Sequence, residues 1–207
     1  MSPFRISFIV IVLAIATIAG AWVARQSLQS PAPAGLTTGT RISPAREIEA
    51  FSLISHQGQP FERQTLTGHW TLMFFGFTHC PAVCPATLAT LVDARRRLEQ
   101  LDAGELPRIV LVSVDPERDT PAALAGYVAR FDSSVTGVTG SIAAIDAFAA
   151  RMGVAHQKIP MSDGDYMVDH SAFVLLLDPQ ARQAAVFTPP HSAERLAADY
   201  LRMLGRG

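Results

Sequence analysis

The chain has 207 residues, of which 49% are hydrophobic and 17% are charged, and its formal net charge is −1. This near-neutral balance gives no indication of nucleic-acid binding, for which a strongly basic balance is typical. Only two cysteines are present, Cys80 and Cys84, so any thiol chemistry is confined to one short stretch.

A hydrophobic segment lies near the N-terminus. Residues 6–24 carry no charge and are bounded by Arg5 and Arg25. A helix rises about 1.5 Å per residue, so this segment nearly spans a hydrocarbon core of roughly 30 Å. We therefore predict that residues 1–25 form a single transmembrane helix that anchors the chain. Small residues near Gly20 leave cleavage as a signal peptide as the alternative. A cytoplasmic Arg5 would place the rest of the chain outside the cytoplasm.

The next segment has the composition of a flexible linker. Residues 26–47 contain Ser, Pro, Ala, Gly and Thr with little apolar periodicity, which is typical of a tether. We expect the folded domain to occupy residues 48–207. Its first part, residues 51–61, predicts a strand, a tight turn at Gly58 and a return strand, which together form a small β-hairpin.

The two cysteines follow a strongly apolar run. Residues 70–77 are rich in aromatic side chains and predict a buried strand that ends near Gly76. Pro85 suits the first turn of a helix, which we expect over residues 86–101. Cys84 would then lie at a helix N-terminus, where the helix dipole favours a thiolate over a thiol.

The spacing of the cysteines allows two kinds of chemistry. With three intervening residues, Cys80 and Cys84 lie about one helical turn apart, so they could bind one soft metal ion or form a disulfide with each other. The alternative is a purely structural disulfide or two buried thiols. The position of the pair, between a strand and a helix of an α/β fold, favours a functional site.

The middle of the chain continues the strand and helix alternation. Residues 108–114 are nearly all β-branched or aliphatic and predict a parallel strand covered on both faces. A helix should begin at Thr120 and Pro121 and end near residue 131. Asp115 and Asp119 could lie near the cysteines, although turn and capping roles also explain them. Another helix is expected over residues 142–152, closed by Gly153.

The last part predicts strands over residues 154–159 and 172–177, a return strand over 183–188, and a final helix capped by Ser192. His170 would stand at the entrance of the central antiparallel strand 172–177. A single histidine there is by default a surface or core residue, so its position alone does not predict a function.

The order of these elements resembles the thioredoxin fold, and three motifs narrow the resemblance. FGFTHCPAVCP over residues 75–85, VDPERDTP over 114–121 and VDHSAF over 168–173 are similar to motifs of the Sco/SenC family, copper proteins that serve cytochrome c oxidase assembly. The resemblance implies an α/β, thioredoxin-like fold with an N-terminal β-hairpin extension, preceded by a transmembrane helix.

The resemblance also implies a site and a function. In that family two cysteines and a histidine bind copper, and the matching residues are Cys80, Cys84 and His170. Two thiolates suit Cu(I), and an added imidazole makes a set that can also hold Cu(II). The expected protein is a metallochaperone of the bacterial inner membrane, with its globular domain in the periplasm. It would deliver copper to the copper A centre of the copper-bearing subunit of cytochrome c oxidase and exchange copper with other chaperones.

Several alternatives stay open beside this interpretation. Many family members carry an acidic residue between the cysteines, where this chain has Ala82. His79, Met161 and Met167 could approach a metal, but we expect none of them to be a ligand. The protein could instead be a thiol-disulfide reductase that uses Cys80 and Cys84 to keep the cysteines of the oxidase copper site reduced, or a module that senses copper or redox state.

Overall fold

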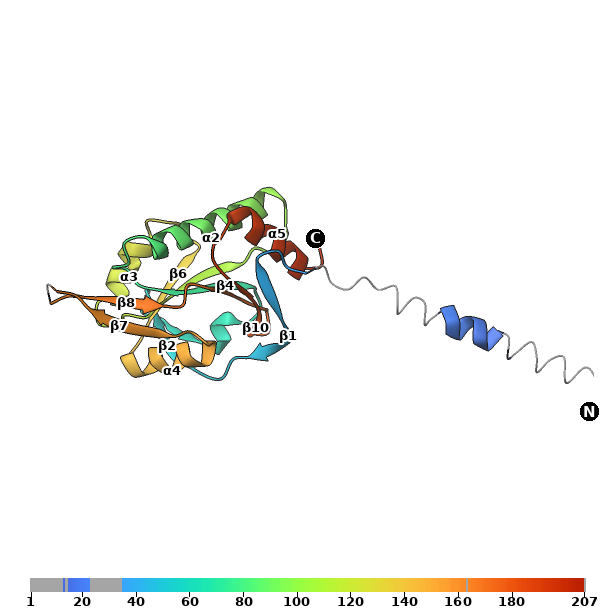
Figure 1. Ribbon diagram of the computed structural model, residues 1–207, viewed down its shortest axis with the longest axis horizontal. Coiled ribbons are helices and arrows are strands. Elements are labelled where there is room, and N and C mark those ends of the chain that lie inside the picture. The colour runs from blue at the N-terminus through green and yellow to red at the C-terminus, as the bar shows by residue number, and fades with distance from the viewer. Residues whose placement is uncertain (1–12, 14, 23–34, 163, 207) are drawn as a thin grey trace, which may run out of the picture. The chain divides into compact units, whose positions relative to one another are not determined.

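The computed structural model describes residues 13, 15–22, 35–162 and 164–206 (Figure 1). The chain divides into two units, residues 1–34 and Gly35–Gly207. In the first unit residues 15–22 are helical. Much of the predicted anchor, and the first part of the predicted linker, lie outside the described residues. Within the part of the chain that is described, no helix has the length and apolar character needed to cross a bilayer.

The second unit is built on an eight-stranded sheet with the order β1-β10-β9-β4-β5-β6-β2-β3, and β7 and β8 form a separate two-stranded sheet. The strands are β1 Gly39–Glu47, β2 Ser52–Ser55, β3 Pro60–Glu62, β4 Thr71–Gly76, β5 Arg108–Ser113, β6 Val135–Thr139, β7 His156–Pro160, β8 Tyr166–His170, β9 Val174–Leu177 and β10 Arg182–Phe187. The helices are the short 3-10 helix η1 Arg63–Leu66 and α2 Val83–Gln100, α3 Pro121–Val128, α4 Ile142–Met152 and α5 Ala193–Met203.

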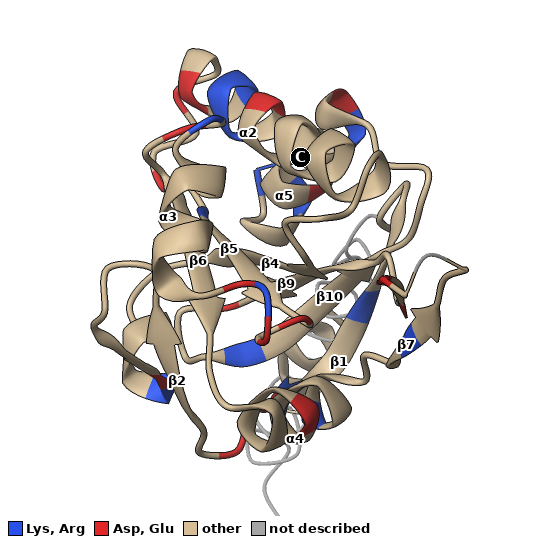
Figure 2. Ribbon diagram, turned by 90° about the vertical axis from the view of Figure 1, so that its left-hand side faces the viewer, with Lys and Arg blue, Asp and Glu red and all other residues tan. Residues whose placement is uncertain are grey.

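Helices cover both faces of the large sheet. Helices α2, α3 and α5 lie on one face and α4 lies on the other (Figures 1 and 2). Strand β4 is parallel to β5 and antiparallel to β9, and all six of its residues are buried. Its apolar composition follows from this central position, since a strand covered on both faces has no solvent-facing side. The predicted α/β architecture is confirmed.

The boundaries of α3 and α4 follow the predicted capping residues, whereas Ser192 precedes α5 without the predicted side-chain capping hydrogen bond. The side chain of Thr120 accepts a hydrogen bond from the backbone N–H of Ala123, and that of Ser141 accepts one from Ala144. Gly153 ends α4 with a φ of 77°, a left-handed conformation that glycine adopts without a steric penalty. Local side-chain chemistry therefore sets where α3 and α4 begin and where α4 ends.

Strand β1 lies in the stretch that we expected to be linker. It pairs with β10 at one edge of the sheet, so the folded unit begins before residue 48. The backbone N–H and hydroxyl groups of Thr37 and Thr38 donate hydrogen bonds of 2.8–2.9 Å to the buried carboxylate of Asp199 on α5. An edge strand with mostly exposed side chains has no apolar alternation, which explains why the sequence did not predict it.

Two further strands differ from the prediction. Strand β6 was not predicted, because Val135–Thr139 is short and contains a glycine and two threonines. The β2–β3 hairpin is present as predicted, but β2 also pairs with β6. The hairpin is therefore the outer edge of the main sheet and not a separate extension.

Candidate metal site

Both cysteines lie at the junction between β4 and α2. Strand β4 ends at Gly76, and α2 begins at Val83. Cys84, in the first turn of α2, is fully buried, whereas Cys80 is partly exposed, and both are free thiols. The backbone N–H of Cys84 lies 3.3 Å from Cys80 Sγ and donates to it. The turn thus directs both sulfurs to the same side.

Gly76 makes room for the buried thiol. A Cβ atom at this position would lie 3.0 Å from Cys84 Sγ and 2.8 Å from a ring carbon of Phe74. Real side chains rarely tolerate such distances in a packed interior. The glycine that ends the predicted strand is therefore needed for the close approach of Cys84 to β4.

His170 lies shortly before the central strand β9, as predicted, but it belongs to a strand, β8, that the sequence did not predict. It is the last residue of β8 in the two-stranded sheet and does not belong to the central strand β9. Strand β8 pairs with β7, and His170 lies opposite His156 at one end of this ladder. Three residues that lie outside both strands then separate His170 from β9.

The imidazole of His170 faces the cysteines. Its Nε2 lies 3.4 Å from Cys84 Sγ, and its Nδ1 lies 3.1 Å from the carbonyl oxygen of Ser171. A carbonyl oxygen only accepts, so Nδ1 carries the proton and Nε2 keeps its lone pair for a ligand. The rings of Phe74 and Phe77 pack against the imidazole in T-shaped arrangements, with centroids 5.9 Å away in both cases. These contacts fix the orientation of the donor atom.

The three donor atoms form one cluster. The two sulfurs and one imidazole nitrogen of Cys80, Cys84 and His170 all lie within 4.8 Å of one another. Within the described part of the chain, no other group of three such side chains converges in this way. Two thiols and one imidazole are the donor types that suit a soft ion such as Cu(I), so the residues fit a single copper ion.

Burial controls the protonation of the donors. It raises the pKa of the Cys84 thiol, to which the hydrogen bond with Cys80 also contributes, and it lowers the pKa of His170. Without a metal, both groups therefore favour their neutral forms. The prediction that the helix N-terminus would favour a Cys84 thiolate is wrong, because burial of the thiol raises its pKa.

A buried carboxylate holds the backbone in front of Cys80. Asp119 is fully buried and accepts hydrogen bonds from the backbone N–H of Thr78 at 3.0 Å, from the Thr78 hydroxyl and from the Ser113 hydroxyl. From the sequence, Asp119 could either stabilise a turn or lie near the cysteines. Its contacts assign it to positioning the cysteine loop.

A second buried carboxylate connects the loop after β5 to β8. Asp115 accepts hydrogen bonds from Arg118 and from the hydroxyl of Tyr166. Sequence reasoning did not single out Arg118 or Tyr166. Because 48 positions separate them, no local pattern could have predicted that they meet.

The other candidate side chains lie outside the cluster. The side chain of His79 is 54% exposed, and its Nδ1 contacts the Thr78 hydroxyl. Met161 is 45% exposed. Met167 lines a shallow hollow of about 270 Å³ beside the donors, whose other apolar lining residues are Phe77, Pro81, Ala82, Val83, Val168 and Ala172. His79 is not among the residues whose donor atoms converge in the cluster.

Comparison with known proteins extends the sequence resemblance. Residues 39–205 match the SCO1/SenC family. The chain is 39% identical over 153 residues to mouse "Protein SCO2 homolog, mitochondrial", an alignment that covers 73% of this chain and 60% of the mouse protein. The chain therefore spans less than two thirds of that relative.

Two solved structures share the fold. Arabidopsis thaliana ScoI with copper bound superimposes with a TM-score of 0.73 at 33% identity and covers 77% of this chain and 98% of its own. Bradyrhizobium japonicum ScoI with copper bound gives a TM-score of 0.68 at 36% identity and covers 75% and 98%. Both similarities cover about three quarters of this chain and nearly the whole of the related chain.

Proposed function

Because the chain belongs to the SCO1/SenC family, we propose that it is a metallochaperone that binds one copper ion through Cys80, Cys84 and His170. Its task is to deliver that ion to the copper A centre of cytochrome c oxidase during assembly. Copper is then the cargo of the protein and is passed on, so the chain acts by binding and release and not by catalytic turnover.

The observation that carries the proposal is the convergence of the donor atoms. The sulfurs come from the β4 to α2 junction and the nitrogen from β8, 86 positions further along the chain, yet all three lie within 4.8 Å of one another. Copper binding requires both thiols to lose their protons. Copper bound in the related Arabidopsis and Bradyrhizobium proteins supports the choice of metal.

The cellular setting follows from the predicted anchor and from the family. We place the folded unit on the periplasmic face of a bacterial inner membrane, held by residues 6–24. Its partners are then the copper-bearing oxidase subunit as acceptor and another copper chaperone as donor. The family resemblance supports these partners.

A thiol-disulfide reductase is the alternative function. The partly exposed Cys80 lies close to Cys84, as a redox pair requires. One observation favours copper delivery instead: an imidazole donor faces the two sulfurs.

Copper titration of the chain from Gln26 onward tests the proposal. We expect one Cu(I) per chain in the wild type, loss of stable binding in Cys80→Ser and Cys84→Ser, and weaker binding in His170→Ala, since a hydroxyl cannot replace a thiolate as a ligand for Cu(I). His79→Ala, Met161→Leu and Met167→Leu serve as controls that keep the stoichiometry. A His79→Ala variant that behaved like His170→Ala would refute the ligand assignment.

A further inference from the structure

The strand that carries His170 depends on few contacts for its position. Strands β7 and β8 pair only with each other among the described strands, and their hairpin projects from one side of the folded unit (Figure 1). The large sheet therefore gives His170 no backbone hydrogen-bond ladder. Side-chain contacts between the hairpin and the rest of the fold must determine where the imidazole lies.

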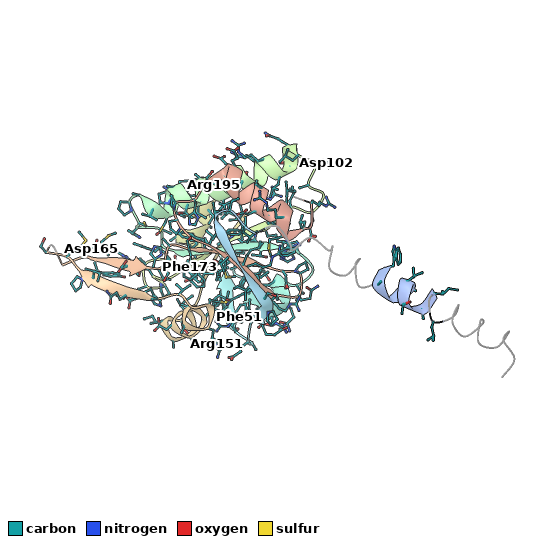
Figure 3. All side chains as sticks on the ribbon, turned by 45° about the vertical axis from the view of Figure 1, so that its right-hand side comes forward. Phe51, Asp102, Arg151, Asp165, Phe173 and Arg195 are labelled. Atoms are coloured by element: carbon teal, nitrogen blue, oxygen red, sulfur yellow. The ribbon has the colours of Figure 1, made fainter. Side chains whose placement is uncertain are left out.

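Arg118 makes the most extensive of these contacts. From the loop after β5, its Nη1 donates to the backbone oxygen of Tyr166 at 3.1 Å and to Asp165 Oδ1 at 3.0 Å. Its guanidinium carbon lies 3.9 Å from the centroid of the Tyr166 ring. Asp165 lies at the outer end of the hairpin (Figure 3). One side chain thus holds both the backbone and the ring at the start of β8.

Asp115 completes the connection to the main fold. Its buried carboxylate accepts the Arg118 Nε–H through Oδ2 and the Tyr166 hydroxyl through Oδ1, the latter at 2.7 Å. Arg118, Tyr166 and Asp115 therefore form a closed set of contacts, and the side chain of Arg118 is only 17% exposed. Hydrogen bonds of this charged, partly buried kind are stronger than those of exposed ion pairs.

We propose that Arg118 is a positioning residue that, through Tyr166 and Asp115, holds β8 in place and so controls how readily His170 leaves a bound copper ion. The inference rests on the proposed function. Tyr166 and His170 are the two ends of the same five-residue strand, about 13 Å apart at the usual rise per residue. A shift of the strand at Tyr166 therefore moves the imidazole relative to the cysteines.

Release kinetics test the proposal directly. Each protein is loaded with one Cu(I), and transfer to an excess of a competing Cu(I) chelator is followed by absorbance. We expect Arg118→Gln to keep the stoichiometry but to release copper about tenfold faster than the wild type, since loss of a residue that orients a ligand costs about 10- to 100-fold. Arg118→Lys should also release faster, because an ammonium cannot reproduce the fork of the guanidinium.

Three comparisons separate positioning from a general loss of stability. Arg151→Gln removes an exposed arginine on α4 that pairs with Glu49 and should release copper at the wild-type rate. The double variant Arg118→Gln, His170→Ala should release no faster than His170→Ala alone, because Arg118 acts through that imidazole. In the copper-free protein, amide exchange over residues 166–170 should be faster in Arg118→Gln, while β4 and β5 stay protected.

Wild-type release rates in Arg118→Gln, or effects of Arg118→Gln and His170→Ala that add in full, would overturn the inference. If Arg118→Gln does not fold, Tyr166→Phe decides, because it keeps the ring and removes only the hydroxyl, which contacts Asp115 and, at 3.4 Å, Glu117. Faster release is again expected. A wild type that binds no copper would refute the proposed function instead, and amide exchange in the copper-free proteins would still show whether Arg118 holds β8.

Discussion

Gly76, the last residue of β4, lies against the Phe74 ring and the buried thiol of Cys84. Substitution by alanine would place a Cβ atom against Cys84 Sγ and the Phe74 ring, and such overpacking usually costs about 1–3 kcal/mol. We expect Gly76→Ala to lower the free energy of unfolding by that amount and to weaken copper binding, as measured by denaturant unfolding and by metal titration.

Gly126 provides the matched control. It lies within α3, and a Cβ atom there would meet no other atom within 4 Å. Gly126→Ala should therefore stabilise the protein by roughly 0.5–1 kcal/mol, through the helix preference of alanine. Equal destabilisation by both substitutions would contradict the assignment of a steric role to Gly76.

Because the pKa of Asp199 is shifted in the folded state, the free energy of unfolding should depend on pH. Burial opposes its ionisation, but hydrogen bonds from the backbone and hydroxyl groups of Thr37 and Thr38 outweigh burial and hold its pKa below the usual value. A carboxylate with a lowered pKa stabilises the fold fully above the unfolded-state pKa of about 3.9 and loses this effect as the pH falls through the folded-state pKa.

The corresponding experiment uses Asp199→Asn. At pH 5–8 its free energy of unfolding should be lower than that of the wild type by about 1–3 kcal/mol, the usual cost of disrupting hydrogen bonds to a buried charged group. The difference should shrink as the pH falls below about 4. A constant difference down to pH 2 would show that ionisation of Asp199 does not support the fold.

The residues of the site were predictable to different degrees. Cys80, Cys84 and His170 were predicted because short motifs surround them, and the structure brings their donor atoms together. Arg118 and Tyr166 were not predicted, because their contact depends on how the hairpin folds back on the loop after β5. The thiolate expectation for Cys84 failed because burial depends on tertiary packing, which the helix position alone does not reveal.

At the level of elements, the hairpin of β7 and β8 should respond to the metal. Copper bound by all three donors would tie β8 to the β4 to α2 junction. We therefore expect amide exchange over residues 164–170 to slow on copper binding and to speed up again when the cysteines are oxidised to an empty, disulfide-bonded form. Strand β5 should stay protected in every state.

Protection by copper around His56 or His191, with residues 164–170 unchanged, would contradict this site. Both histidines already have other contacts. His56 Nδ1 accepts the backbone N–H of Gly137, and His191 Nε2 lies 2.9 Å from the carbonyl oxygen of Ala172.

Elements with a strong local signal were predicted best. Strand β9 is apolar throughout and β4 and β5 are apolar in their central residues, and α3 and α4 carry capping residues at their starts. Strand β1 lacks both kinds of signal. Its partner, β10, lies more than 130 positions further along the chain. Sequence patterns indicate buried segments and local turns, so they do not predict an exposed edge strand.

At the scale of the whole molecule, the start of the folded unit can be tested by truncation. The fragment 35–207 keeps β1 and the contacts of Thr37 and Thr38 with Asp199, whereas the fragment 48–207, which begins at the predicted domain boundary, loses both. We expect the shorter fragment to be less stable by at least about 1–3 kcal/mol, because the buried carboxylate loses these hydrogen bonds and keeps only its pairing with Arg202.

The shorter fragment should also self-associate, because β10 would become an uncovered edge with mostly buried, apolar residues. Denaturant unfolding and size-exclusion chromatography of the two fragments measure both effects. Equal stability and a monomeric state for both would show that β1 is dispensable.

The contacts of Asp199 also determine how the folded unit carries mechanical load. Helix α2 has 18 residues and is therefore about 27 Å long. Cys84 lies in its first turn. At the other end, the hydroxyl of Tyr200, next to Asp199, donates a hydrogen bond to the carbonyl oxygen of Glu105, just beyond the last turn. A pull on the chain upstream of Thr37 would first reach the folded unit at the contacts of Thr37 and Thr38 with Asp199, at the end of α2 remote from the cysteines. Tension on the N-terminal segment would thus enter the folded unit away from the three donor atoms.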